Sequence, residues 1–234
     1  MFMRGWKSVS VYAVVLTVLL VCVHLGNRTV TVFSENRAVD RDHCIVIDPG
    51  HGGEDGGAVS RTGLPESNLN LEIALRLKDL FNLLGYDTYM TRSTDISVYT
   101  KGETLSQKKA SDLKERVKRI NETEGAVLLS IHQNHFPDQR YHGGQVFYGK
   151  TQGSRELAEL LQSAFLSVLQ SPASRQAKQS SGIYLMEHIT CPGVLIECGF
   201  LSNPQEEANL RNPDYQKKLC AVIAAATCQY LSNT

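Results

Sequence analysis

Short apolar runs alternate with amphipathic segments along residues 43–234, and this alternation constrains the fold more than any other sequence feature. The apolar runs predict buried strands. The amphipathic segments, with apolar residues three and four positions apart, predict helices. Strands that alternate with helices favour a largely parallel sheet covered by helices on both faces. We therefore expect a single α/β domain with a mostly parallel central sheet of about six strands.

Each expected element can be placed by residue number. The strands are predicted at 44–48, 87–91, 126–131, 144–148, 183–186 and 194–197. The helices are predicted at 68–84, 105–122, 154–170 and 214–231. Ser67 or Asn68 can cap the first helix, and Gly85 can end it.

The composition excludes several classes of protein. The 234 residues include 24 basic and 24 acidic residues, so no basic excess exists to neutralise nucleic-acid phosphates. An apolar content of 42% fits a globular domain and not a disordered chain. Six cysteines without a CxxC pair argue against a disulfide scaffold and against a cysteine-based zinc site.

The N-terminal region differs from the rest of the chain. Residues 9–25 form an uncharged run of 17 residues, which is at the lower limit for a membrane-spanning helix. Arg4 and Lys7 precede the run and favour a cytoplasmic N-terminus. No small-x-small cleavage site follows it, so we expect an uncleaved signal-anchor. The predicted parts are a membrane segment, a tether and an exported catalytic domain, at residues 1–26, 27–42 and 43–234.

Ionisable residues follow three of the predicted strands. His51 comes shortly after the first strand, His132 ends the 126–131 strand and Glu197 ends the last strand. Glu66 lies in the loop after His51, near the start of the next helix. Sites in open α/β sheets form beyond the carboxyl ends of the strands, so these four side chains are expected to converge there.

Two histidines and one carboxylate form a recognised catalytic zinc set. Zinc would acidify water and polarise a carbonyl group. A further carboxylate would serve as general base and then as acid, and Glu197 suits this role because burial at a strand end raises a pKa. Histidines this far apart in sequence can also be structural and hydrogen-bonded, and the spacing by itself leaves both interpretations open.

Several motifs carry a family resemblance. The segments VIDPGHGGEDGGA (46–58), LLSIHQNH (128–135) and PGVLIECGFLSN (192–203) resemble the zinc-dependent N-acetylmuramoyl-L-alanine amidases of bacterial cell-wall turnover. The segments TRSTD (91–95) and DLKER (112–116) also fit. The stretch from Ser174 onward looks most like the germination-specific, spore-cortex branch of that family.

The resemblance implies roles for individual residues. By matching motif, His51, Glu66 and His132 would be the zinc ligands, and Glu197 would be the catalytic acid/base. The residue after Glu66 is Ser67, where the family often has Lys. Glu54, in the first loop, is a rival third ligand, although it lies only three residues from His51 in a glycine-rich turn.

Three further residues and one charged segment are candidates for other roles. Asn134 is a candidate for orienting His132 or binding substrate, and a turn-forming Asn is the equal alternative. Arg175 matches a family position and is a candidate for binding substrate peptide or glycan, or for a surface salt bridge. Asp48 is a candidate partner of a ligand histidine. The charged run 108–119 is predicted to be a solvated helix face.

The resulting functional prediction is an exported, membrane-tethered zinc amidase. It would hydrolyse the amide between N-acetylmuramic acid and L-alanine in peptidoglycan, in the cortex maturation that forms muramic-δ-lactam for germination. The segment 136–142 is a candidate contact for an accessory protein. The rival hypotheses are a non-catalytic peptidoglycan-binding domain and a phosphate-binding hydrolase that uses the loop after residue 48 as an anion cradle.

Overall fold

A computed structural model describes residues 42–169, 171–172 and 174–234 of the chain. The predicted membrane segment 1–26 and the tether, except for Asp42, lie outside the described residues. Within the described part of the chain, no helix combines the length and the apolar character needed to cross a membrane.

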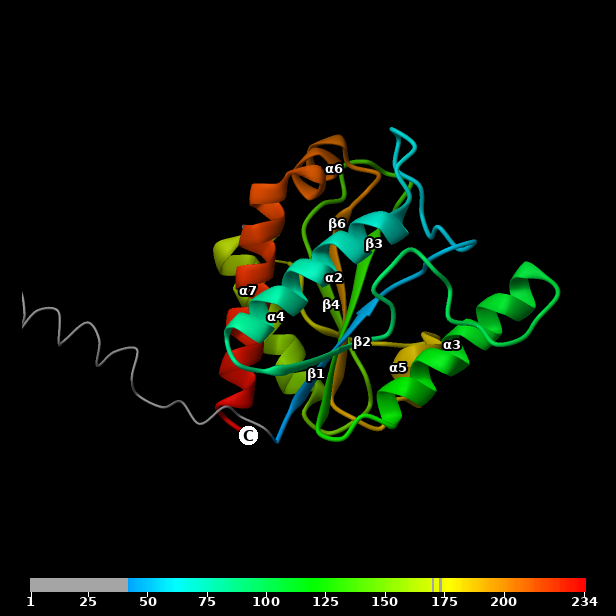
Figure 1. Cartoon of the computed structure of the whole chain (residues 1–234). Helices are drawn as coiled ribbons and strands as arrows, with labels where there is room; N and C mark the ends of the chain where they lie inside the picture. The colour runs from blue at the N-terminus through cyan, green and yellow to red at the C-terminus, as the bar shows by residue number, and fades with distance from the viewer. Residues whose placement is uncertain (1–41, 170, 173) are drawn as a thin grey trace, which may run out of the picture. The chain divides into compact units, whose positions relative to one another are not determined.

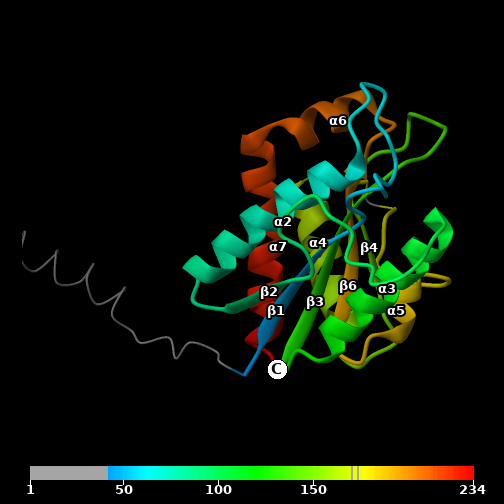
Figure 2. The same cartoon turned by 45° about the vertical axis from the view of Figure 1, so that its right-hand side comes forward.

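The sheet has six strands in the order β2-β1-β3-β6-β4-β5. Its strands β1, β3 and β6 can be followed in Figures 1 and 2. Neighbouring strands run parallel except β4 and β6, which are antiparallel. The central strands are apolar and buried, as expected for strands covered on both faces. The strand bounds are β1 Cys44–Pro49, β2 Asp87–Met90, β3 Ala126–Asn134, β4 Gln145–Tyr148, β5 Lys178–Gln179 and β6 Gly193–Phe200.

Helices cover both faces of this sheet, with α2, α4 and α7 on one face and α3 and α5 on the other (Figures 1 and 2). Their bounds are α2 Glu66–Leu83, α3 Leu105–Asn121, α4 Ser154–Val168, α5 Tyr184–His188, α6 Pro204–Arg211 and α7 Pro213–Leu231. The expected single α/β domain with a mostly parallel six-stranded sheet is thereby confirmed.

The core consists of two clusters, one on each face of the sheet. Ile131 and Ile196 contribute to the larger cluster, and Leu128 and Leu195 contribute to the smaller one. Successive side chains of a strand point to opposite faces. Cys198 belongs to the larger cluster, so Glu197 faces the side covered by α3 and α5. The two clusters therefore pack β3 and β6 from both faces, up to the strand ends that carry His132 and Glu197.

One predicted strand is wrong. The run 183–186 forms the start of the short helix α5, where Leu185 and Met186 cover the sheet from its side. A four-residue apolar run fits a strand and a buried helical turn equally well, so its periodicity could not separate the two. The two-residue edge strand β5 supplies the sixth strand instead.

The starts of two helices also differ from expectation. Helix α2 begins at Glu66 after Pro65 and has no side-chain cap, although Ser67 or Asn68 was expected to provide one. Helix α6 was not predicted. It begins with Pro204, after Asn203, whose side chain accepts hydrogen bonds from the amides of the first turn.

Candidate active site

The carboxyl ends of β1, β3 and β6 lie at one edge of the sheet, and the predicted site residues gather there. Register places His132 on β3 directly beside Glu197 on β6. The loop after β1 carries His51, and the same loop ends at Glu66, the first residue of α2. Three neighbouring parallel strands therefore bring together residues that lie up to 146 positions apart in sequence.

His51, Glu66 and His132 form a compact cluster. Each offers one nitrogen or oxygen atom, and these atoms lie within 4.8 Å of one another. Glu66 Oε1 is 3.0 Å from His132 Nδ1, and Glu66 Oε2 is 3.4 Å from His51 Nε2. The structure thus brings the three predicted ligands together, while their role as ligands stays a prediction.

Hydrogen bonds from the backbone fix the Glu66 carboxylate. The amide of Ala58 donates to Oε2 over 2.9 Å, and the amide of Gln133 donates to Oε1 over 3.1 Å. The side chain of Asn70 also donates to Oε1. Burial raises the pKa of Glu66, but the two histidines outweigh burial and hold this pKa far below its usual range. Glu66 is therefore an oriented, ionised carboxylate.

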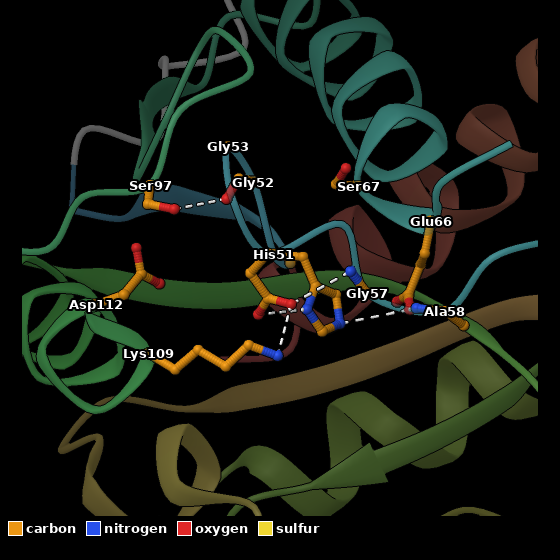
Figure 3. A network of polar contacts seen from close by, with 12 residues as sticks. His51, Gly52, Gly53, Gly57, Ala58, Glu66, Ser67, Ser97, Lys109 and Asp112 are labelled. Atoms are coloured by element: carbon orange, nitrogen blue, oxygen red, sulfur yellow. Dashed lines mark hydrogen bonds and ion pairs between the residues drawn. The ribbon is translucent and has the colours of Figure 1, made fainter. Parts of the chain in front are cut away.

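Asp55 contacts the ring nitrogen of His51 that does not face Glu66. Figure 3 shows His51 in this network between Glu66 and Lys109. Asp55 Oδ2 is 3.0 Å from His51 Nδ1, and Lys109 Nζ is 2.8 Å from Asp55 Oδ1. Because Asp55 accepts a hydrogen bond at Nδ1, the other ring nitrogen, Nε2, is directed toward Glu66. Burial lowers the pKa of His51, but the carboxylates of Glu66 and Asp55 outweigh burial and raise the pKa to about 9. Asp55 was missed by the sequence reasoning, although it follows His51 by four residues.

Two glycines make room for this cluster. A Cβ atom on Gly50 would lie 2.2 Å from the His132 ring, so only glycine fits there. A Cβ atom on Gly57 would lie 2.6 Å from Glu66 Oε2 and 2.7 Å from the His51 ring. Gly57 also has φ of 70°, a left-handed conformation that favours glycine. The glycine-rich loop is thus shaped around the side chains of the cluster.

A buried ion pair supports the loop from beneath. Arg116 Nη1 donates to Asp48 Oδ1 over 2.6 Å, and Thr91 and Ser130 donate to the same carboxylate. Burial raises the pKa of Asp48, but Arg116 and the hydroxyl donors outweigh burial and lower the pKa to about 2. Arg116 also donates to the carbonyl oxygen of His51 over 2.7 Å.

Two expectations are corrected by this ion pair. Asp48 is not the partner of a ligand histidine, because its oxygens are occupied by Arg116 and the two hydroxyl groups. The run 108–119 is not solely a solvated face, because the Arg116 side chain is only 2% exposed. A helix with a charged surface can bury one guanidinium that pairs with a buried carboxylate. The sequence of the helix alone does not show where that carboxylate, here Asp48, will lie.

Arg92 is a second buried guanidinium beneath the loop. It donates to the carbonyl oxygens of Pro49 and Gly50 at the end of β1. It also donates to the carbonyl oxygen of Ser67 in the first turn of α2, over 2.9 Å. Arg92 therefore ties together the two chain segments that carry His51 and Glu66.

Glu197 differs from every other carboxylate of the site. Its Oε2 atom is buried, and no group of the described residues hydrogen-bonds to it. Burial is the main cause that raises the pKa of Glu197, to about 7. A carboxyl group with such a pKa exists in both protonation states at neutral pH, which is what a group that takes up and releases a proton requires.

The remaining predicted residues lie around the cluster. Glu54 is exposed and bound to Lys108 Nζ over 2.7 Å, so its carboxylate is engaged away from the two histidines. Asn134 ends β3, and its carbonyl oxygen accepts from the Leu201 amide. Arg175 donates two hydrogen bonds to the carbonyl oxygen of His142 and contacts the ring of Phe200 at the end of β6. Exposed Phe136 and Tyr141, predicted at the surface, contact each other with ring centroids 4.5 Å apart.

Chemically, the cluster suits a divalent metal ion. Two imidazoles and one carboxylate are the donor set of catalytic zinc sites that keep a position open. The low pKa of Glu66 and the high pKa of His51 both mean that the cluster stabilises positive charge. Asp55 holds one of the imidazoles as carboxylates do in such sites. The residues present therefore fit a zinc ion.

Comparison with known proteins supports the same reaction class. The model of the N-acetylmuramoyl-L-alanine amidase family Amidase_3 matches residues 45–229. The germination-specific N-acetylmuramoyl-L-alanine amidase of Bacillus subtilis is 42% identical over 191 residues, which cover 81% of this chain and 80% of that protein. LytC, an amidase of the same organism, is 30% identical over 189 residues, which cover 80% of this chain and 35% of that protein.

Solved structures agree with these sequences. The CwlD amidase from Clostridioides difficile, in complex with the GerS lipoprotein, has a TM-score of 0.78 and 36% identity. This match covers 82% of the present chain and 100% of the CwlD chain in that structure. The catalytic domain of the CwlV amidase from Bacillus (Paenibacillus) polymyxa has a TM-score of 0.68 and 29% identity, and the match covers 81% and 98% of the two chains. The chain therefore belongs to the N-acetylmuramoyl-L-alanine amidase family, and the expected enzyme class is confirmed.

Proposed function

We propose that the chain is a zinc-dependent amidase that cleaves the bond between N-acetylmuramic acid and L-alanine in peptidoglycan. One observation carries the zinc assignment: His51, Glu66 and His132 present their ligand atoms within 4.8 Å of one another, at the edge of the sheet where Glu197 also lies. We infer the identity of the cleaved bond from the family to which the chain belongs. Zinc held by these three residues would act as a Lewis acid on the scissile carbonyl and would acidify water.

Glu197 would move the proton. Amide hydrolysis forms a carbon–oxygen bond and breaks a carbon–nitrogen bond, so a proton must leave the attacking water and reach the departing amine. The Glu197 carboxylate would accept that proton and then deliver it to the nitrogen of L-alanine. Its pKa of about 7 and its Oε2 atom, to which no described residue hydrogen-bonds, support this role.

The relatives also suggest the biological setting. The 42% identical protein of Bacillus subtilis is germination-specific. We extend that setting to this chain and place it in cortex maturation, because removal of the peptide frees the lactyl carboxyl group that a muramic-δ-lactam ring needs. Since peptidoglycan lies outside the cytoplasmic membrane, the domain would act after export, held by the predicted segment 1–26.

An accessory protein is a further part of the proposal. CwlD was solved in complex with the GerS lipoprotein, so one related amidase assembles with a lipoprotein. For this chain we place the contact at the exposed Phe136 and Tyr141 pair. Capture of a partner by the full chain, and its loss in a Phe136→Ala, Tyr141→Ala variant, would support this contact. Equal capture by both proteins would exclude it.

Mass spectrometry of digested peptidoglycan tests the proposed reaction. The zinc-loaded full chain should release peptides that begin with L-alanine and leave glycan with free lactyl carboxyl groups. The matched controls are chelator-treated protein and the Glu197→Gln variant, both of which should release neither product. Cleavage within the glycan or within the peptide, or equal yields from the Glu197→Gln variant, would contradict the proposal.

A further inference from the structure

A cavity of about 480 Å³ opens one strand away from Glu197. Gln145, which lines it, lies directly opposite Glu197 in the antiparallel pair of β4 and β6. Directly opposite residues share a face of the sheet, with Cβ atoms about 5 Å apart. Tyr141, Arg175 and Lys178 line the cavity further out. Its volume falls in the range of cavities that hold small ligands, roughly 300–1,000 Å³.

Arg175 is held in a defined position in this cavity. Its Nε and Nη2 atoms donate to the carbonyl oxygen of His142 over 2.9 and 2.7 Å. Its Nη1 atom lies 3.5 Å from Gln145 Oε1, and its guanidinium carbon lies 4.9 Å from the centre of the Phe200 ring. These contacts orient the guanidinium beside Gln145 without neutralising its charge, because a carbonyl oxygen, an amide and an aromatic ring are all uncharged.

Two cationic side chains of the cavity have no ion-pair partner among the described residues. Within the described chain, neither Arg175 nor Lys178 forms an ion pair, whereas Arg140 at the rim is paired with Asp138 over 2.7 Å. The charge of Glu206 acts on Arg175, but its oxygens accept from the backbone amides of Gly143 and Phe200 instead. A fixed guanidinium with free donor capacity is the typical recognition group for a carboxylate.

We infer that this cavity binds the stem peptide of the substrate and that Arg175 recognises a free carboxylate on the residue that follows L-alanine. This inference rests on the proposed function, which places the bond between muramic acid and L-alanine at Glu197. The residue after L-alanine in such peptides is D-glutamate linked through its side chain, so its α-carboxylate is free. L-alanine and D-glutamate together span at most about 7 Å of extended chain, which exceeds the step of about 4.8 Å from β6 to β4.

A pair of substrates that differ only in this carboxylate tests the inference. One is N-acetylmuramoyl-L-alanyl-D-isoglutamate, and the other carries an amide in place of the α-carboxylate. The full chain should have a kcat/KM about tenfold higher for the acid, because a hydrogen-bonded charge pair discriminates by at least that factor. Arg175→Gln should remove this preference by lowering kcat/KM for the acid alone, and Arg175→Lys should retain part of it. The control Arg211→Gln changes an exposed arginine of α6 and should keep the preference.

A purely structural role of Arg175 would lower kcat/KM for both substrates equally, and that result would overturn the inference. The inference also fails if the full chain shows no preference for the acid.

A binding measurement separates failure of this inference from failure of the proposed function. The free peptide L-alanyl-γ-D-glutamyl-diaminopimelate should bind the full chain, and Arg175→Gln should weaken that binding about tenfold. Such binding together with no cleavage of muramoyl–L-alanine bonds would contradict the proposed function and leave the cavity assignment standing. Cleavage without any peptide binding would contradict the cavity assignment alone.

Discussion

Two carboxylates at the same edge of the sheet, on strands that flank β3, have opposite surroundings. Asp48, on β1, receives hydrogen bonds from Arg116, Thr91 and Ser130, and its pKa falls to about 2. Glu197, on β6, has one oxygen to which no residue of the described chain hydrogen-bonds, and its pKa rises to about 7. Burial acts in the same direction on both groups, so the surrounding donors decide the difference. One carboxylate is thereby committed to holding the loop, and the other is left able to exchange a proton.

The largest expected effect comes from removing the cation beside Asp48. Arg116→Met should lower the free energy of unfolding by about 3–5 kcal/mol, because Asp48 would become an unpaired buried charge. Urea unfolding measures this loss.

The double variant Asp48→Asn, Arg116→Met is the matched control, because it also removes the orphaned charge. It should be more stable than Arg116→Met alone. If the double variant is no more stable than the single one, the ion pair does not act as described.

The second prediction concerns the other carboxylate. Glu197→Gln should reduce kcat by about 10³-fold, because an amide cannot accept and deliver the proton. The unfolding midpoint and the zinc content should stay at wild-type values, since within residues 42–234 as described no group hydrogen-bonds to Glu197 Oε2. Retained turnover with intact zinc would assign the proton transfer to another group.

The third prediction concerns how the free energy of unfolding depends on pH through Asp48. The pKa of Asp48 is lowered from 3.8 to about 2 on folding. The contribution of Asp48 to the free energy of unfolding is about 2 kcal/mol. It is therefore complete above pH 4 and is lost as pH falls toward 2. Unfolding free energies measured across this window should fall more steeply for the wild type than for Asp48→Asn. Identical acid slopes in the two proteins would contradict the assignment.

The smallest predicted effect tests the support of His51. Asp55→Asn should weaken zinc binding about tenfold, because a carboxylate partner orients a ligand imidazole and raises its basicity. Competition with a chromophoric chelator measures this affinity. Glu54→Gln, one residue away, is the matched control and should leave the affinity unchanged. A larger loss for Glu54→Gln than for Asp55→Asn would favour the rival ligand.

Sequence patterns predicted the sheet and the gathering of the site because both follow from strand ends. The apolar runs at β1, β3 and β6 are continuous, so parallel packing could be expected, and with it the meeting of His51, His132 and Glu197. The sequence pattern did not predict contacts that depend on tertiary partners. The helix pattern predicts that Arg116 is solvent-exposed, whereas the structure shows it buried in an ion pair with Asp48.

Two other features, helix α5 and the contact between Asp55 and His51, were not predicted from the sequence. The run that became α5 is too short for its periodicity to separate helix from strand. The contact between Asp55 and His51 depends on a tight turn in which His51 has φ of 61° and the two glycines after it also have positive φ. Such loop conformations are set by the packed neighbours as much as by the residues themselves.

Anomalous diffraction at the zinc absorption edge, from crystals of the zinc-loaded protein, tests the central claim most directly. We predict one zinc ion bound by His51, Glu66 and His132, with the Glu197 carboxylate nearby but outside the ligand set. A zinc ion that takes Glu197 or Glu54 as its carboxylate ligand, or no zinc peak at this cluster, would contradict the account.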